Sequence, residues 1–180
     1  ADEQRQVGHY WLRNPQMAPS DEVRAHIARE IDLIEQFGKD VIGGVVKAPN
    51  GEAFTDVLWI GIGGSGLGPL LMIKALQTHG QGLPFHFFDN VDPNGMSAVL
   101  TGLGDKLKTT LVVTVSKSGG TPEPHLGMEQ ARHRVEAQGG SWAGQAVAIT
   151  MLDSKLDQQA KEESWLQRFD MFDWVGGRTS

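Results

Sequence analysis

The chain has 180 residues, no cysteine and a formal net charge of −6, with 16 Lys and Arg against 22 Asp and Glu. This length suits one domain with a short extension, and the lack of cysteine excludes disulfides, thiolate zinc sites and a cysteine nucleophile in these residues. The acidic balance and the absence of an apolar stretch of roughly 20 residues argue against nucleic-acid and membrane partners. We expect a protein of the reducing cytoplasm.

Residues 1–50 predict an arm followed by one helix. The first nineteen residues contain two prolines and apolar anchors such as Trp11, and they predict an extended arm. Ser20 is suited to cap a helix whose apolar residues recur at helical spacing until Gly38 ends it. We expect this arm and helix to pack on a core formed by residues 51–180.

From residue 51 onward, apolar runs alternate with helical patterns. The sequence predicts strands at 57–62, 85–89, 111–115, 145–150 and 169–174, separated by helices at 69–78, 93–103, 122–138 and 154–163. Continuous apolar runs such as 57–62 indicate strands that are buried on both faces. The predicted fold class is therefore α/β: a doubly wound five-stranded parallel sheet in the flavodoxin-like order 2-1-3-4-5, with a helical N-terminal extension.

A glycine-rich turn follows the first of these strands. Gly61-Ile62-Gly63-Gly64-Ser65-Gly66 fits the pattern G-x-G-x-x-G, and Asp89 ends the second strand where a ribose-binding acid would stand. One interpretation is an NAD-dependent oxidoreductase. A second is that the turn, with Ser65, binds a smaller anionic or hydroxylated ligand at a helix N-terminus. A third is that the glycines only allow a tight turn, and this motif alone leaves all three open.

A second polar loop follows the third strand. Ser116, Ser118 and Thr121 place three hydroxyls within six residues, and Gly119-Gly120 leaves backbone N–H groups able to point inward. Thr121 is suited to cap the next helix, whose N-terminus adds partial positive charge. This set of donors suits a phosphate monoester without a metal, although an ordinary polar loop with a good helix cap is the simpler alternative.

The predicted strand order brings the two loops together. In the order 2-1-3-4-5 the topological switch point lies between strands one and three, where open α/β sheets bind ligands. A dinucleotide would use the first loop and leave the second without a task. A phosphorylated small molecule would use the second loop for its phosphate and the first for the rest.

Three motifs in this order resemble the glucose-6-phosphate isomerase family: Gly61–Ser65 with Gly68-Pro69, Ser116–Glu123, and Gly176–Ser180. The chain is similar to the N-terminal sugar-isomerase (SIS) domain of the cyanobacterial and plant-plastid branch, from about Tyr10 to Ser180. The resemblance implies that residues 51–180 form a phosphosugar-binding domain of this type. It implies isomerisation of glucose 6-phosphate to fructose 6-phosphate in glycolysis and gluconeogenesis, with no cofactor, no metal and a homodimeric full-length enzyme.

The same resemblance implies a role for each candidate residue. One residue is implied to be catalytic: Arg178 would stabilise the negative charge of a cis-enediolate, as a fixed guanidinium can. The other seven residues are implied to bind substrate. Gly64 and Ser65 would contact the sugar, and Gly177 stands next to the arginine. The phosphate would be held by Ser116, Ser118 and Thr121 with the backbone of Lys117.

Two departures from the family pattern limit these expectations. Thr179 stands where the family commonly has an aromatic residue, and the family's glutamate base, histidine and lysine lie beyond the Gly-Gly-Arg loop. We therefore expect this chain to be part of an enzyme that, alone, binds phosphosugar weakly at most and does not isomerise it. A non-catalytic phosphosugar-binding module remains an alternative. Because the fifth strand is at the sheet's far edge, we also expect the residues around Arg178 to be poorly anchored.

One helix face could be mistaken for a metal site. His125, Glu129 and His133 recur at i, i+4 and i+8, a spacing that can chelate zinc or nickel. No fourth ligand is suggested, and a solvated helix face explains the pattern. We expect no metal.

Overall fold

The computed structural model describes residues 6–77 and 82–177. The elements in chain order are α1 (His9–Arg13), the 3-10 helix η1 (Pro15–Met17), α2 (Asp21–Ile42), β1 (Asp56–Ile60), α3 (Gly64–Leu76), β2 (Phe85–Phe88), α4 (Pro93–Leu103), the 3-10 helix η2 (Gly104–Thr109), β3 (Thr110–Val115), α5 (Pro122–Ala137), β4 (Ala146–Thr150), α6 (Lys155–Glu162) and β5 (Gln167–Asp170). Within these described residues no helix combines the length and the apolar character needed to cross a membrane.

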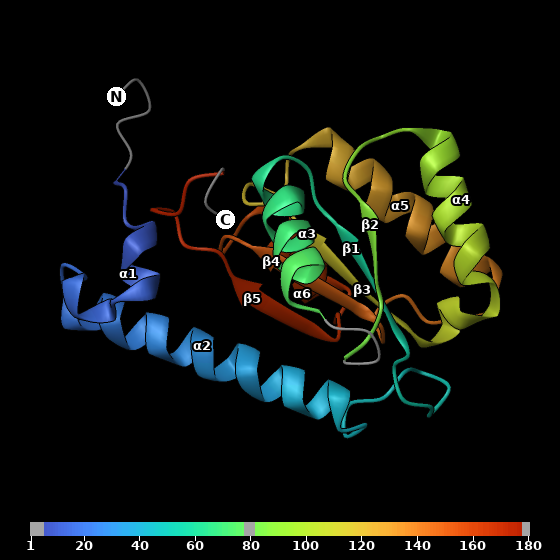
Figure 1. Ribbon diagram of the computed structural model, residues 1–180, viewed down its shortest axis with the longest axis horizontal. Coiled ribbons are helices and arrows are strands. Elements are labelled where there is room, and N and C mark those ends of the chain that lie inside the picture. The colour runs from blue at the N-terminus through green and yellow to red at the C-terminus, as the bar shows by residue number, and fades with distance from the viewer. Residues whose placement is uncertain (1–5, 78–81, 178–180) are drawn as a thin grey trace.

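The strands form one parallel sheet of five strands in the order β2-β1-β3-β4-β5 (Figure 1). This order confirms the predicted fold class and places the reversal of strand order between β1 and β3. Ile60 pairs with Thr114, so the loops that follow β1 and β3 leave the sheet side by side at its carboxyl edge.

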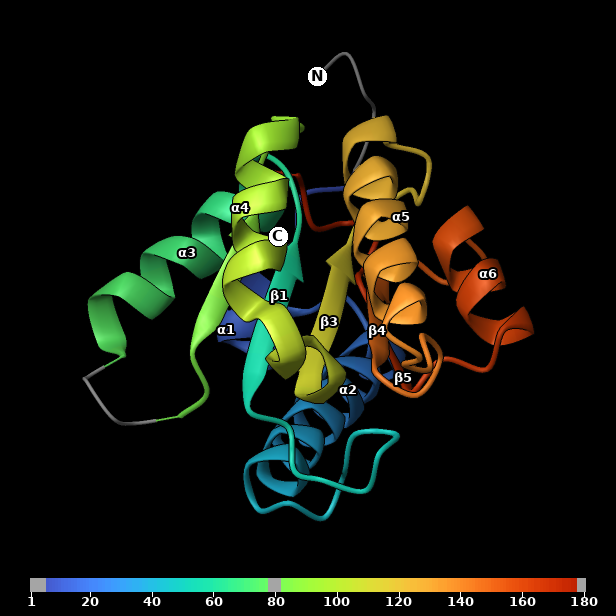
Figure 2. The same ribbon diagram turned by 90° about the vertical axis from the view of Figure 1, so that its right-hand side faces the viewer.

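Helices cover the two faces of the sheet unequally. Helices α4 and α5 lie in front of the strands in Figure 2, with α6 to their right, and α2 lies behind the sheet. Residues of α4, α5 and α6 share one core cluster. Side chains alternate between the faces as expected for β-strands. Leu58 and Val112 join the cluster under α4, α5 and α6, and Val57 and Val113 join the cluster that includes Val41 of α2.

The N-terminal part is more helical than its sequence predicts. Residues 9–13 and 15–17 are helical, so the expected extended arm is wrong there, and Trp11 is buried against Trp174 with a ring-centroid distance of 5.0 Å. Helix α2 also passes through Gly38 and ends at Ile42. Its last turn buries Val41 against the sheet, and this contact outweighs the weak helix propensity of one glycine.

Two boundaries beside the cavity described below also differ from the prediction. Helix α3 begins at Gly64 instead of residue 69, although Pro69 lacks the N–H that would bond to the Ser65 carbonyl. The indole N–H of Trp59 donates to that carbonyl at 2.7 Å and replaces the missing helix bond. Strand β5 covers Gln167–Asp170 instead of 169–174, because Phe172 and Val175 turn away and pack with Trp11.

Candidate functional site

A cavity of about 400 Å³ lies at the carboxyl ends of β1 and β3, at the switch point of the sheet. Its lining residues come from the loops after β1, β3, β4 and β5, from the end of β3 and from the first turns of α3 and α5: Ile62, Ser65, Val115, Ser116, Lys117, Ser118, Thr121, Pro124, Met151 and Gly177. The loops after β1, β3 and β5 carry the three sequence motifs and are called the first, second and third loop. Six of the eight candidate residues line the cavity. Gly64 opens α3 and is not among the lining residues, and Arg178 lies outside the described residues.

The loop after β3 is closed by its own hydrogen bonds. The N–H of Gly119 donates to the Ser116 carbonyl at 3.2 Å, and the N–H of Gly120 donates to Ser118 Oγ at 3.2 Å. The expectation that these two amides are left to face a ligand is therefore wrong for this conformation. Gly119 has a φ of +64°, and a Cβ there would lie 2.3 Å from the backbone nitrogen of Leu156, so only glycine lets the loop pack on α6.

Three residues of this loop that carry hydroxyls line the cavity: Ser116, Ser118 and Thr121. Ser116 is 6% exposed, and its Oγ has no hydrogen-bond partner among the described residues. Thr121 occupies the N-cap position of α5 as predicted, but its side chain makes no capping hydrogen bond. A buried hydroxyl without a partner costs on the order of 1–3 kcal/mol, and an incoming ligand oxygen removes this penalty. The partial positive charge at the start of α5 favours an anionic ligand.

The glycine-rich turn after β1 is shaped by close packing. A Cβ on Gly66 would lie 2.3 Å from the Gly61 carbonyl oxygen, and a Cβ on Gly61 would lie 2.7 Å from the Ser65 carbonyl oxygen. These two glycines of the G-x-G-x-x-G pattern are therefore required by the turn itself. The turn places Ser65 in the wall of the cavity, opposite the hydroxyls of the second loop.

The third loop reaches the cavity from the far strand β5. Its Gly177 lines the cavity, although β4 separates β5 from β3. Phe172 and Val175 are buried, and the Val175 carbonyl accepts a hydrogen bond from Lys117 Nζ at 2.6 Å. Residues 172–175 are therefore anchored, and the expectation of poor anchoring for Arg178 lies outside the described residues.

A buried hydroxyl chain supports the second loop from behind. Thr150 at the end of β4 donates from Oγ1 to the Ser116 carbonyl at 2.6 Å, and the hydroxyls of Thr150 and Ser154 lie 2.6 Å apart. Ser154 caps α6 by accepting from the N–H of Asp157 at 3.1 Å. Thr150 is not among the site residues predicted from the sequence, because its only local signal is a hydroxyl at the end of an otherwise apolar strand.

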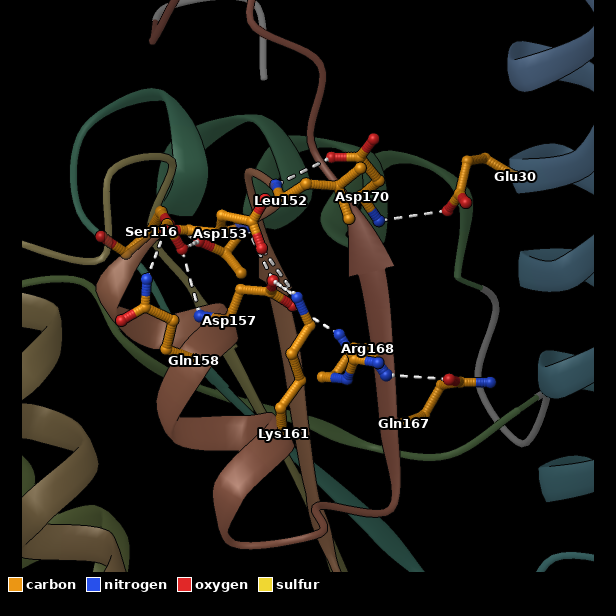
Figure 3. A network of polar contacts seen from close by, with 12 residues as sticks. Glu30, Ser116, Leu152, Asp153, Asp157, Gln158, Lys161, Gln167, Arg168 and Asp170 are labelled. Atoms are coloured by element: carbon orange, nitrogen blue, oxygen red, sulfur yellow. Dashed lines mark hydrogen bonds and ion pairs between the residues drawn. The ribbon is translucent and has the colours of Figure 1, made fainter.

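Ion pairs connect α6 to β5, and a hydrogen bond connects β5 to α2. Figure 3 shows Asp157 beside Lys161 and Arg168, whose nitrogens lie 2.6 and 2.5 Å from its carboxylate oxygens. Burial alone would raise the pKa of Asp157, but hydrogen bonds from Lys161, from the backbone N–H of Asp153 and from Arg168 outweigh it and lower this pKa. Glu30 of α2 accepts from the backbone N–H of Asp170 at 3.1 Å in the same view.

The described residues contain no group of three or more His, Asp or Glu side chains arranged to hold a metal ion. His125, Glu129 and His133 lie along α5 without forming such a group. Over the part of the chain that the structure describes, the cavity is lined by hydroxyl-bearing side chains and no carboxylate, a set that suits an anion better than a cation.

Comparison with known proteins gives a consistent match over the chain. Residues 1–180 match the family described as phosphoglucose isomerase. A glucose-6-phosphate isomerase from Synechococcus sp. strain CC9605 is 81% identical over 99% of this chain and 34% of its own length. The glucose-6-phosphate isomerase of Parasynechococcus marenigrum strain WH8102 is 79% identical over 99% of this chain and 32% of its own length. The chain thus spans about a third of the length of these curated relatives.

Solved structures share the fold. A glucose-6-phosphate isomerase from Chlamydia trachomatis superposes with a TM-score of 0.81 at 32% identity, covering 98% of this chain and 33% of that one. A hypothetical protein from Thermus thermophilus superposes with a TM-score of 0.71 at 26% identity, covering 96% of this chain and 39% of that one.

Proposed function

This chain belongs to the phosphoglucose isomerase family, and on that premise we propose that it is the phosphosugar-binding part of an enzyme that converts glucose 6-phosphate to fructose 6-phosphate. The single observation that carries the proposal is the buried, unpartnered hydroxyl of Ser116 in a cavity shared with Ser65, Ser118 and Thr121. A phosphate or sugar oxygen satisfies such hydroxyls, and the N-terminus of α5 favours its negative charge.

Each loop has a separate task in this proposal. Ser116, Ser118 and Thr121, with the backbone of Lys117, hold the phosphate. Gly64 and Ser65 contact the sugar, with Gly64 acting through the first turn of α3, since it is not among the residues that line the cavity.

The reaction moves one proton from C2 to C1 and a second from the O2 hydroxyl to O1, and it leaves the atom count of the sugar unchanged. A base removes the C2 proton of the open-chain aldose, a cis-enediolate forms, and a proton is returned to C1 to give the ketose. The negative charge of the enediolate is stabilised by Arg178, which follows Gly177 in sequence. The base and the ring-opening groups come from the remaining two-thirds of the enzyme's length.

The proposal also covers the organisation of the parent enzyme. Residues 51–180 form a sugar-isomerase (SIS) type domain, and residues 1–50 form an extension that packs on it through α2. The full-length enzyme is a cytoplasmic homodimer that uses no cofactor, no metal and no nucleic-acid partner. The family membership supports the domain assignment, and the hydroxyl-rich cavity supports phosphosugar binding.

Calorimetric titration of the 180-residue chain with fructose 6-phosphate tests the binding part. We expect weak binding that Ser116→Ala and Thr121→Val abolish. Ser97→Ala, on the exposed side of α4 in a separate cavity, is the matched control and leaves binding unchanged. Binding that survives both loop variants would overturn the phosphate assignment, and micromolar NAD(H) binding unaffected by sugar phosphate would favour an oxidoreductase.

A coupled isomerase assay tests the catalytic part. We expect turnover from the full-length enzyme and none from the 180-residue chain. A full-length enzyme that binds the sugar phosphate but does not convert it would instead identify a phosphosugar-binding module.

A further inference from the structure

The side chain of Lys117 leaves the second loop and binds the third. Its Nζ donates to the backbone carbonyls of Asp173 at 2.5 Å and Val175 at 2.6 Å. The Asp173 carboxylate lies 3.6 Å from the same nitrogen, and the Lys117 side chain is only 14% exposed. An ammonium group has three donors, and the two carbonyls take two of them, which leaves Lys117 little capacity for a phosphate.

The order of the strands explains what this contact does. Strand β5 lies two places from β3 in the sheet, so the chain after β5 must cross the end of β4 to reach the cavity. The N–H of Met171 still donates to the Thr150 carbonyl at 2.8 Å, and four residues later Lys117 holds the Val175 carbonyl. Gly177 then lines the cavity. The Lys117 side chain therefore connects this loop directly to the second loop.

The opposite side of the third loop is held by the N-terminal arm. Trp174 stacks on Phe172 with a centroid distance of 4.6 Å and lies 5.0 Å from Trp11, and its carbonyl accepts from the N–H of Gly8 at 3.0 Å. The aromatic cluster fixes where the loop lies on the arm. The lysine fixes where it lies relative to the phosphate-binding hydroxyls.

We propose that Lys117 is a positioning residue for the isomerisation, whose side chain fastens residues 173–177 to the second loop. This inference rests on the proposed function. The contact sets the distance between the phosphate-binding hydroxyls and the point where the chain continues into Arg178. Loss of the contact therefore frees residues 173–177 to shift relative to these hydroxyls and leaves the phosphate contacts intact. A misplacement of about 1 Å at a reacting centre lowers a rate by up to about 100-fold.

Steady-state kinetics of full-length K117M test the proposal. We expect kcat to fall about 10- to 100-fold while KM for fructose 6-phosphate changes less than about threefold. Ser116→Ala, which removes a phosphate contact, raises KM instead. Asp173→Asn keeps the carbonyl that Lys117 binds and is the matched control, with kcat close to that of the wild type. K117Q carries a smaller loss of kcat in the same direction and serves if K117M does not fold.

Chymotrypsin cleavage after Trp174, followed by mass spectrometry, reports the contact without activity. We expect cleavage to be several-fold faster in K117M and K117Q, and unchanged in Asp173→Asn. A rise in KM with kcat unchanged, or unchanged kcat and cleavage, would overturn the proposal. If the wild-type enzyme shows no isomerase activity, the proposed function fails, and the cleavage rates still decide whether Lys117 fastens the loop.

Discussion

Both faces of the sheet carry an apolar cluster, but the two faces differ in how they are covered. On the closed face, α4, α5 and α6 pack over Leu58, Val112 and Ala146, each fully buried. On the open face, a groove of about 760 Å³ lies between α2 and α3 and is lined by residues of all five strands. The groove is lined almost entirely by apolar side chains such as Trp59 and Ile149. The strands carry apolar side chains on both faces, but helices of this chain bury them fully on one face only.

The helices that border the groove show the same imbalance. Helix α3 exposes apolar side chains around much of its surface, with Leu71 67% exposed and Leu76 67% exposed. Helix α2 exposes Ile34 and Ile42 at 51% and 71%. Contiguous apolar surface of this kind marks a site of further association. The closed face is thus covered by helices of this chain, and the open face keeps apolar side chains exposed beside the groove.

The largest expected effect comes from a cavity under the closed face. Leu58→Ala removes a side chain with no exposed surface and is expected to lower the free energy of unfolding by about 2–5 kcal/mol. Leu76→Ala, on the groove side, is the matched control and is expected to change it by less than about 0.5 kcal/mol. Urea denaturation followed by circular dichroism measures both. Equal losses would contradict the distinction between the faces.

The next largest effect concerns the ion pairs of α6, the helix of the closed face that lies next to β5. Asp157→Asn removes the partner of Lys161 and Arg168 and is expected to lower the free energy of unfolding by about 1–3 kcal/mol at neutral pH. Because the folded pKa of Asp157 is below its ordinary 3.8, this contribution is present above that value and is lost as pH falls through the folded pKa. The difference between wild type and variant should therefore shrink on acidification, and a constant difference would contradict this account.

Two glycine substitutions are expected to have opposite signs. A Cβ on Gly127 of α5 would lie 3.1 Å from Ile60 Cγ2 and 3.4 Å from Phe88 Cδ2, whereas a Cβ on Gly38 of α2 would have no neighbour within 4 Å. Gly127→Ala is therefore expected to destabilise by about 1 kcal/mol through overpacking. Gly38→Ala is expected to stabilise by about 0.5–1 kcal/mol through helix propensity. Thermal melts measure both, and the same sign for both would show that the faces are packed alike.

The smallest effect on stability is expected in the groove itself. Met72→Gln is expected to change the free energy of unfolding by less than about 0.5 kcal/mol, because its side chain is largely exposed. The same variant is expected to reduce the fluorescence of a bound apolar dye such as anilinonaphthalene sulfonate. Unchanged dye binding would mean that the groove is not the apolar surface that the dye detects.

The sequence predicts correctly those elements whose bounds are set by a few neighbouring residues. The predicted helix at 93–103 has the same bounds as α4, where Asp92 caps the helix and Pro93 occupies its first position. The parallel order of the strands follows from their alternation with helices. The prediction that a helix ends at Gly38 and the prediction of a strand at 171–174 were wrong. Both depend on burial of Val41 and Phe172 against residues that are distant in sequence.

The sequence by itself determined the α/β class, the switch point and the hydroxyl-rich loop, because strand periodicity, glycine turns and helix caps are local properties. Only the tertiary structure decided that Ser116 is buried without a partner, since burial depends on every element packed around the loop. The same holds for Lys117, which binds carbonyls 56 and 58 residues away. A contact of this kind has no local pattern, because its geometry exists only after the sheet has brought the two loops together.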